Sequence, residues 1–155
     1  MSRFDEELNV QFYFNRGVEL LDHNQYKQAV ESFREVIAND ARHAKAHLNL
    51  GIALTHLNLW EEAVEAFNQA IHLKPDLPET YVRLGVTYGM LGRHHEAIDG
   101  FKKAINLRPT YPAAHLNLGI AHLNLNNPDA AMEEYRMLIN LDRNRAEKLF
   151  RLIYK

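Results

Sequence analysis

Apolar residues recur along this chain at spacings of three and four, which is the period of an α-helix packed on one side. Two such stripes follow each other in the middle of the chain, and their members are Tyr81, Leu84 and Tyr88 and then Ala97, Phe101 and Ala104. The polar stretch GRHHE lies between the two stripes, and its Gly92 interrupts the helical pattern. The pattern therefore predicts two helices joined by a short turn.

The two-stripe pattern returns every 34 residues, and a glycine in the first stripe marks each copy. The glycines are Gly17, Gly51, Gly85 and Gly119. The residue 12 positions later is Ala29, Ala63, Ala97 or Ala131, and the residue 16 positions later is Phe33, Phe67, Phe101 or Tyr135. The octapeptide AHLNLGIA occurs twice, at residues 46–53 and 114–121. The sequence therefore predicts four copies of one helical hairpin.

Small residues at fixed places in each copy indicate close packing of helices. A glycine inside a helix costs about 1 kcal/mol relative to alanine, so we expect each glycine to permit a close approach that no side chain would allow. We expect the aromatic residue 16 positions later to fill the gap between helix pairs. One hairpin cannot bury its apolar face alone, and about three stacked repeats are needed for stability.

The 34-residue period, with its leucine-glycine, alanine, aromatic and proline places, resembles the tetratricopeptide repeat family over residues 10–143. The resemblance implies an all-α fold, a right-handed α-solenoid or superhelix of four helix-turn-helix units with a C-terminal capping helix. The expected repeats are about 10–43, 44–77, 78–111 and 112–145 in a single domain of residues 1–155, and residues 146–155 are the expected capping helix.

A second stripe of each first helix remains once the packing positions are assigned, and the resemblance implies that it lines a concave groove. Its central members form a polar ladder of Asn15, Asn49, Arg83 and Asn117. Two apolar columns accompany the ladder: Phe14, Leu48, Val82 and Leu116, and Val18, Ile52, Val86 and Ile120. An asparagine amide both donates and accepts hydrogen bonds, so the ladder can pair with the backbone of a peptide. The alternative is that the asparagines are only solvent-exposed polar residues. A separate hypothesis is that Arg83 holds a carboxylate by a bidentate contact.

The composition argues against several classes of function. The formal net charge is −2, with 18 basic and 20 acidic residues, so we expect no binding to nucleic acid. Cysteine is absent, and no apolar run approaches the roughly 18 residues of a membrane span. The first ten residues, MSRFDEELNV, lack the apolar core of a secretory signal, so we expect a cytoplasmic protein with no membrane insertion.

The nine histidines raise the question of a metal site, because His43 and His47 are four residues apart on an expected helix. However, His47 and His115 occupy the column that holds Tyr13 and Tyr81 in the other repeats, which favours a packing role. Phosphate-binding loops and nucleophile elbows are also missing. We therefore expect no metal, no cofactor and no enzymatic activity.

The function that these observations predict is a protein–protein interaction module, an adaptor that binds an extended or helical segment of a partner protein in its groove. Two alternatives stay open. One is a structural scaffold that forms a homo-oligomer through the apolar last helix, which contains Phe150, Ile153 and Tyr154. The other is an accessory binding domain of a larger multidomain protein.

Overall fold

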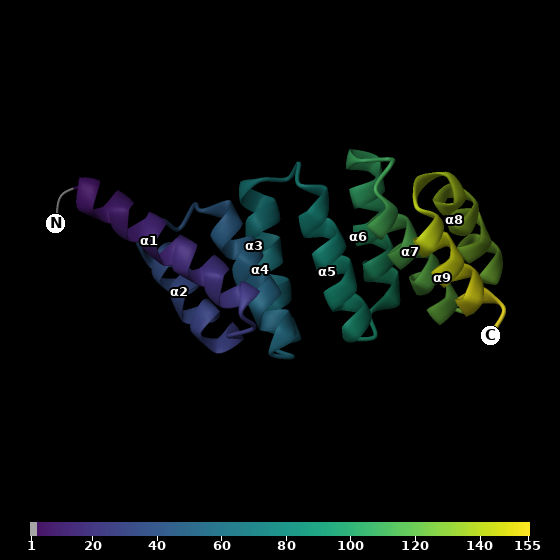
Figure 1. The fold of residues 1–155 in the computed structure, drawn as a ribbon, viewed down its shortest axis with the longest axis horizontal. Coiled ribbons are helices and arrows are strands. Elements are labelled where there is room, and N and C mark those ends of the chain that lie inside the picture. The colour runs from purple at the N-terminus through teal and green to yellow at the C-terminus, as the bar shows by residue number, and fades with distance from the viewer. Residues whose placement is uncertain (1–2) are drawn as a thin grey trace. The chain divides into compact units, whose positions relative to one another are not determined.

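The computed structural model describes the backbone of residues 3–155 and the side chains from Glu7 onward. This part of the chain folds into helices joined by short turns (Figure 1). The helices are α1 (Arg3–Asp22), α2 (Tyr26–Asn39), α3 (Ala44–His56), α4 (Trp60–Leu73), α5 (Pro78–Met90), α6 (His94–Leu107), α7 (Pro112–Asn124), α8 (Pro128–Leu141) and α9 (Arg143–Ile153). Consecutive helices pack in pairs, α1 with α2, α3 with α4, α5 with α6 and α7 with α8. The predicted all-α fold of four helix-turn-helix repeats is therefore confirmed.

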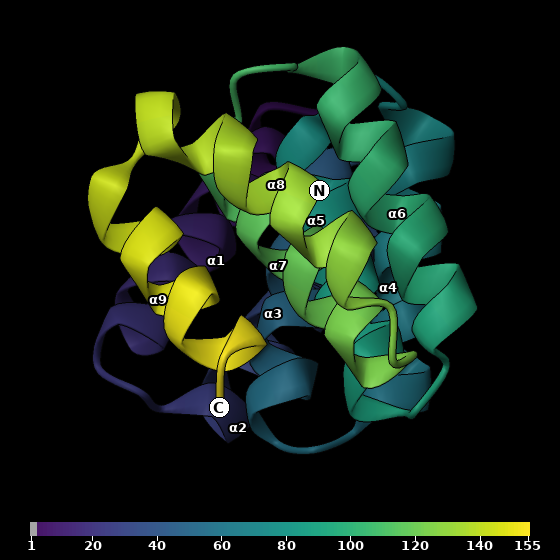
Figure 2. The same cartoon turned by 90° about the vertical axis from the view of Figure 1, so that its right-hand side faces the viewer.

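The chain, expected to be a single domain, divides into two compact units, Met1–Pro75 and Asp76–Lys155. In the first unit, the hairpin of α1 and α2 packs on the hairpin of α3 and α4, mainly through α2 and α3. In the second unit α6 packs on α7 in the same way, and α9 covers both α7 and α8 (Figure 2). Each unit therefore buries the apolar faces of two stacked hairpins.

One turn geometry recurs in all four hairpins. The residue after the last turn of each first helix has a positive φ, between 55° and 73°, and these residues are Asn24, Asn58, Gly92 and Asn126. The next N–H then donates to the carbonyl five residues earlier, as Gln25 does to Leu20 at 2.8 Å and Arg93 to Tyr88 at 2.9 Å. Asparagine and glycine tolerate this left-handed conformation better than other residues. The sequence therefore places a stop signal at the same point of every repeat.

The glycines of the first three hairpins lie against the aromatic residue 16 positions later. A Cβ atom on Gly17, Gly51 or Gly85 would lie 2.6 Å from the nearest ring carbon of Phe33, Phe67 or Phe101, respectively. These rings are buried, with at most 3% of their surface exposed. The close approach is thus the contact of a helix backbone with an aromatic ring, and it fixes the spacing of the two helices in each hairpin.

The fourth hairpin departs from this arrangement. The side chain against Gly119 is Leu149 of α9, and not Tyr135. Tyr135 is half-buried and lies beside the ring of Phe150. No following hairpin covers this end of the described array, and α9 packs into the place with an aliphatic side chain. Tyr135 therefore packs against the cluster that joins the last hairpin to α9, and the glycine–aromatic contact of the first three hairpins is not repeated here.

Helix α9 is the capping helix, and it begins at Arg143, earlier than the sequence suggested. The carboxylate of Asp142 accepts a hydrogen bond from the backbone N–H of Arg145 at 3.0 Å, which caps the start of the helix. Leu149 and Ala146 are buried together with Leu116 and Leu138, and Ile153 packs against this cluster. One face of α9 therefore completes the core of the second unit.

Two histidines are buried packing residues. The Nε2 atom of His47 lies 3.0 Å from the carbonyl oxygen of Ala41, and the Nε2 atom of His115 lies 2.7 Å from the equivalent carbonyl oxygen of Pro109. Because a carbonyl only accepts, each imidazole donates through Nε2. The Nδ1 atom of His115 lies 2.6 Å from a carboxylate oxygen of Glu134. Both rings tie a first helix to the loop that precedes it.

We predict that Gly85→Leu destabilises the protein, because its side chain would meet the Phe101 ring and the carbonyl oxygen of Ala97, 3.0 Å from an added Cβ. Overpacking of this kind costs about 1–3 kcal/mol or more. Urea unfolding followed by circular dichroism measures the loss. Gly89→Ala is the matched control on the same helix, because no atom lies within 4 Å of its added Cβ. Equal stability of Gly85→Leu and wild type would contradict the packing role.

We predict that His122 makes stability depend on pH. Its burial lowers the pKa of the imidazole and the charge of Lys102 lowers it further, while Glu134 and Glu133 oppose the shift. The unfolded chain then binds a proton more readily than the folded chain. His122 therefore costs no stability above the unfolded pKa of about 6.5. The free energy of unfolding falls as the pH drops below this value towards the folded pKa.

The check is urea unfolding at several values from about pH 8 to about pH 5, the range in which histidine titrates. His122→Leu is the comparison variant, since Leu20 and Leu54 occupy this place in the first two repeats. The variant should lose less stability on acidification than the wild type does. Parallel curves for the two proteins would show that His122 does not contribute.

Candidate functional site

Each unit carries two of the ladder residues on its first helices, and we call the surface around them in each unit the ladder face. In the first unit α1 carries Asn15 and α3 carries Asn49, and these helices are in contact. In the second unit α5 and α7, also in contact, carry Arg83 and Asn117. Each unit therefore brings two ladder residues to neighbouring helices.

The polar groups of the ladder already make local hydrogen bonds. The Oδ1 atom of Asn15 accepts from Nε2 of Gln11 at 2.8 Å, and the Nδ2 atom of Asn117 donates to the carbonyl of Ala113 at 2.9 Å. Arg83 is exposed and lies 3.3 Å from the carboxylate of Glu79. These contacts orient the side chains, and an amide has a second N–H and further lone pairs to offer a ligand.

The two apolar columns differ in depth. Leu48, Val82 and Leu116 are buried, with 6–8% of their surface exposed, so they support the helices and present little surface. Phe14 is half-buried against Phe33 and His43, at centroid distances of 6.0 and 4.8 Å. The members of the second column are all half-buried, and they are Val18, Ile52, Val86 and Ile120. The surface beside the ladder is therefore narrower than the sequence suggests.

A cavity of about 220 Å³ opens between α5, the start of α6 and α7 in the second unit. Val86, Asn117 and Ile120, three of the predicted site residues, line it. The other lining residues are Gly85, Gly89, Met90, His94, Ala97, Phe101, Ala121 and Asn124. Gly89 and His94 are not among the site residues predicted from the sequence. The signal for Gly89 was present, because the equivalent positions hold Leu21, Thr55 and Leu123.

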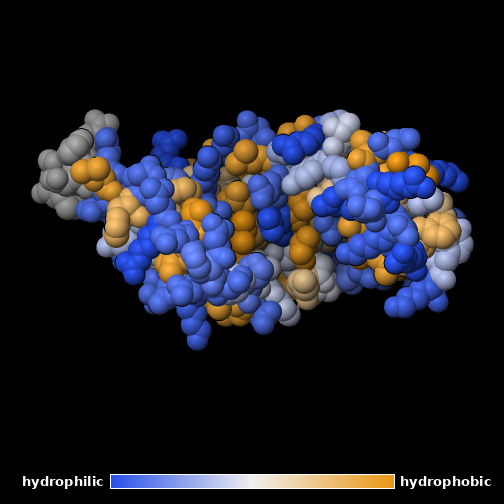
Figure 3. All heavy atoms as spheres, viewed as in Figure 1, coloured by the Kyte–Doolittle hydropathy of each residue, from blue (hydrophilic) through white to orange (hydrophobic). Residues whose placement is uncertain are grey.

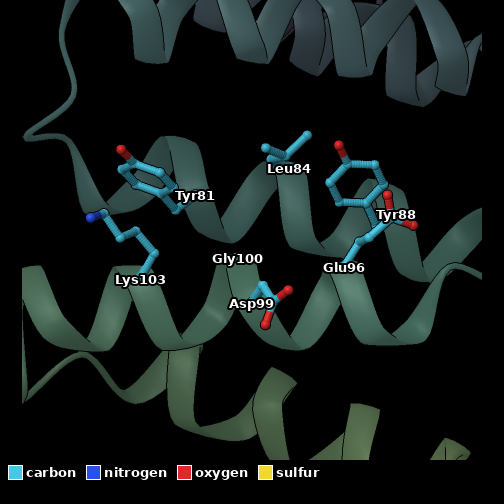
Figure 4. A pocket seen from close by; sticks show the side chains of 7 residues that line it. All are labelled: Tyr81, Leu84, Tyr88, Glu96, Asp99, Gly100 and Lys103. Atoms are coloured by element: carbon cyan, nitrogen blue, oxygen red, sulfur yellow. The ribbon is translucent and has the colours of Figure 1, made fainter.

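Another cavity, of about 380 Å³, lies on a different face of the hairpin of α5 and α6. Figure 4 shows Tyr81, Leu84 and Tyr88 on one helix above Glu96, Asp99 and Lys103 on the other. The equivalent residues of α3 and α4, among them His47, Leu50 and Glu65, line a cavity together with Arg34 of the preceding hairpin. In the first unit this face of the hairpin packs on the preceding hairpin, through α2 and α3. We therefore assign no ligand to the corresponding face of α5 and α6.

The described residues offer no set of metal ligands. No group of three or more histidine, cysteine, aspartate or glutamate side chains comes together among them. The buried His47 and His115 serve packing, as described above. Within the same residues, none of the helices has the length and apolar character needed to cross a membrane.

Comparison with known proteins gives matches to tetratricopeptide repeat models at residues 14–78, 90–126 and 112–145. A search of curated proteins found no significant match.

Solved structures share the fold. The crystal structure of MamA matches with a TM-score of 0.84 and 25% sequence identity over 90% of this chain and 81% of that chain. A MamA structure (41-end) from Desulfovibrio magneticus RS-1 gives a TM-score of 0.83 at 22% identity, with 89% and 78% of the two chains covered. The Arabidopsis OM64 TPR domain gives 0.74 at 20% identity, covering 76% of this chain and 98% of that domain.

Proposed function

Since the chain belongs to the tetratricopeptide repeat family, we propose that it is a non-catalytic adaptor that binds an extended or helical segment of a partner protein along the ladder face. The same proposal holds if these repeats are the binding domain of a larger multidomain protein. The general role as a protein-interaction scaffold is supported by the family and the fold together.

The observation that carries the proposal is the juxtaposition of an amide with an apolar recess on one face. Asn117 lines the cavity of the second unit beside Ile120 and Val86. The first unit has the same pair of residue types in Asn49 and Ile52, both half-buried. An amide next to apolar surface suits a peptide, whose backbone needs hydrogen bonds while its side chains need burial.

Binding proceeds through two kinds of contact in this proposal. The ladder amides donate to and accept from backbone groups of the segment, which gives affinity for many sequences. The half-buried column of Val18, Ile52, Val86 and Ile120 takes apolar side chains. Arg83 leaves its ion pair with Glu79 and binds a carboxylate of the partner instead, because a guanidinium pairs with any carboxylate in reach.

Charge supports a protein partner over a nucleic acid. The stripes around the ladder contain Lys45 and Arg83 as permanent cations, together with the acids Asp22 and Glu79. Nucleic-acid binding requires several basic groups that neutralise phosphates, and this balance does not supply them.

We predict that Asn49→Ala combined with Asn117→Ala weakens capture of the partner and leaves the fold intact. Two hydrogen bonds with net values of about 1 kcal/mol each correspond to roughly a 30-fold loss of affinity. Affinity purification with quantitative mass spectrometry first identifies the partner, and titration calorimetry then measures its binding to both proteins.

The matched control is Asn68→Ala with Asn106→Ala, which removes two exposed asparagines from the second helices α4 and α6. This control should bind as the wild type does, and all variants should melt at similar temperatures. If the ladder variant binds the partner as tightly as the wild type does, the role of the asparagines is refuted.

A second candidate function, self-assembly through α9, is favoured by the apolar surface that this helix leaves uncovered. Figure 3 shows apolar residues at the surface of this end of the chain. The rings of Tyr135, Phe150 and Tyr154 form a continuous row, with centroids 5.3 and 4.6 Å apart, and Phe150 and Tyr154 are 42% and 67% exposed. A row of exposed aromatic side chains is typical of an interface.

We predict that, if this surface joins copies of the chain, Phe150→Asp with Tyr154→Asp converts oligomers into monomers. Ile153 is unsuitable for this test, because it packs against the core cluster of the cap. Asn140→Asp, an exposed substitution on α8, controls for added negative charge. Size-exclusion chromatography with light scattering measures the mass, and a wild-type protein that is monomeric at high concentration would exclude self-assembly.

A further inference from the structure

Gly89 of α5 leaves a space that a side chain occupies in the other repeats. No atom lies within 4 Å of the position where its Cβ would stand. Its φ is not in the left-handed region, so the backbone does not require glycine here. A glycine that serves neither packing nor a turn weakens its helix without a structural return. Its effect is to keep the cavity between α5, α6 and α7 open.

The inner lining of this cavity is largely apolar. Its buried residues are Gly85, Ala97, Phe101 and Ala121. Val86 and Ile120 are half-buried beside them, and Met90 and Asn124 are exposed. The Nδ1 atom of His94 is itself buried, so it offers a ligand no polar contact. A charged group would lose its hydration here without a partner, whereas a hydrocarbon group gains by burial.

The fourth repeat shows what occupies the corresponding place. The residue of α7 that is equivalent to Gly89 is Leu123, 34 positions later. Leu123 is half-buried and packs against the buried cluster that contains Leu149 of α9. Helix α9 contacts α7 as α7 contacts α5. In the fourth repeat a leucine of the first helix therefore fills the space towards the helix that follows, and at Gly89 the same space stays open.

The first and second repeats also carry a side chain at this place. Leu21 stands there in the first repeat and is half-buried. Thr55 stands there in the second, and its hydroxyl donates to the carbonyl of Gly51 at 2.8 Å. Leucine is thus the residue in two of the four repeats, and the third repeat is the one without a side chain at this place.

We propose that the cavity binds a leucine side chain of the partner segment, which takes the place that Leu123 fills in the fourth repeat. The leucine lies over Gly89 and against Val86 and Ile120. This proposal rests on the proposed function and specifies the side chain that the ladder face of the second unit selects. Asn117 lines the same cavity, so its amide is available to the backbone of the segment next to this leucine.

The size of the cavity suits a single apolar side chain. A cavity of about 150 Å³ binds benzene, and pockets for drug-sized ligands begin at about 300 Å³. The cavity beside Gly89 has about 220 Å³, which is room for one side chain and not for a larger ligand. Leucine is favoured over an aromatic residue because the fold itself places leucine at this position, in Leu21 and Leu123.

The test uses blocked amino acids as probes, the N-acetyl N-methylamides of leucine, alanine and phenylalanine. Each is titrated into the isotope-labelled full chain, and NMR follows the methyl groups of Val86 and Ile120 and the amide of Gly89. We expect the leucine probe to bind roughly 10-fold more tightly than the alanine probe, the effect of burying about two further methylene groups. Equal binding of these two probes, no shift with leucine, or tighter binding of phenylalanine would overturn the proposal.

Two substitutions at Gly89 locate the leucine probe. Gly89→Ala improves the helix and adds only a Cβ, which no atom contacts, so the cavity stays open. Gly89→Leu adds the side chain that Leu123 provides in the fourth repeat and fills the cavity. Both variants should melt above the wild type, with Gly89→Leu at the higher temperature.

Only Gly89→Leu should abolish binding of the leucine probe, and a loss in a more stable protein cannot come from unfolding. Gly89→Ala is the matched control and should still bind it. Unchanged binding of the probe in Gly89→Leu would place the probe elsewhere and refute the cavity as its site.

The outcome is separable from that of the ladder variants. If the leucine probe binds as expected while Asn49→Ala with Asn117→Ala captures its partner normally, the preference of the cavity stands and the role of the ladder fails. If the ladder variant loses its partner and the leucine probe does not bind, the adaptor stands and the leucine proposal fails. In the identified segment, a leucine-to-alanine change should weaken binding to the wild type and leave binding to Gly89→Leu unchanged.

Discussion

The contact between a glycine of the first helix and a buried phenylalanine of the second sets the geometry of the first three hairpins of this protein. Because a Cβ at Gly17, Gly51 or Gly85 would lie 2.6 Å from the ring of a phenylalanine, the two helices cannot keep their spacing with any larger residue. The spacing in turn decides which residues face the next hairpin and which remain on the ladder face. The positive-φ asparagine or glycine of each turn then fixes the direction in which the second helix returns.

That constraint leaves the positions outside the packing stripe free to differ, and the candidate site lies among them. Leu21 and Gly89 occupy equivalent places, as do Tyr26 and His94. The first unit uses these positions to close its surface, with Tyr26 stacked on His56. The second unit has a small residue and an imidazole there instead, and a cavity results. Two units with the same backbone plan thus present different surfaces to a partner.

The sequence predicted the helices, the turns and a close approach at each glycine, because a period of 34 residues repeats the same physical requirements four times. It did not predict that the aromatic ring of the same hairpin makes this contact. The sequence did not predict how deeply the groove residues are buried. Leu48, Val82 and Leu116 were expected to line a groove, and they are buried. The repeat pattern also gave no indication of the contact at Gly119. Leu149 of α9 lies there in place of the aromatic residue of the hairpin, and α9 lies outside the 34-residue repeats. The apolar pattern did not predict the cavity, and its sequence signal is the glycine at position 89, where the other repeats have Leu21, Thr55 and Leu123.

Stability and binding make opposite demands at the same helix. Gly85 weakens α5 but is required, because the ring of Phe101 occupies the space of its side chain. Gly89 weakens the same helix with nothing opposite it, so folding alone would favour leucine or alanine there. The buried and unpaired nitrogen of His94 adds a second local cost at the same recess. Sites that break the local rules of a fold in this way are where function is expected, and the two departures coincide on the face that also carries Asn117. The second unit is therefore the part of the chain that departs furthest from what packing alone requires.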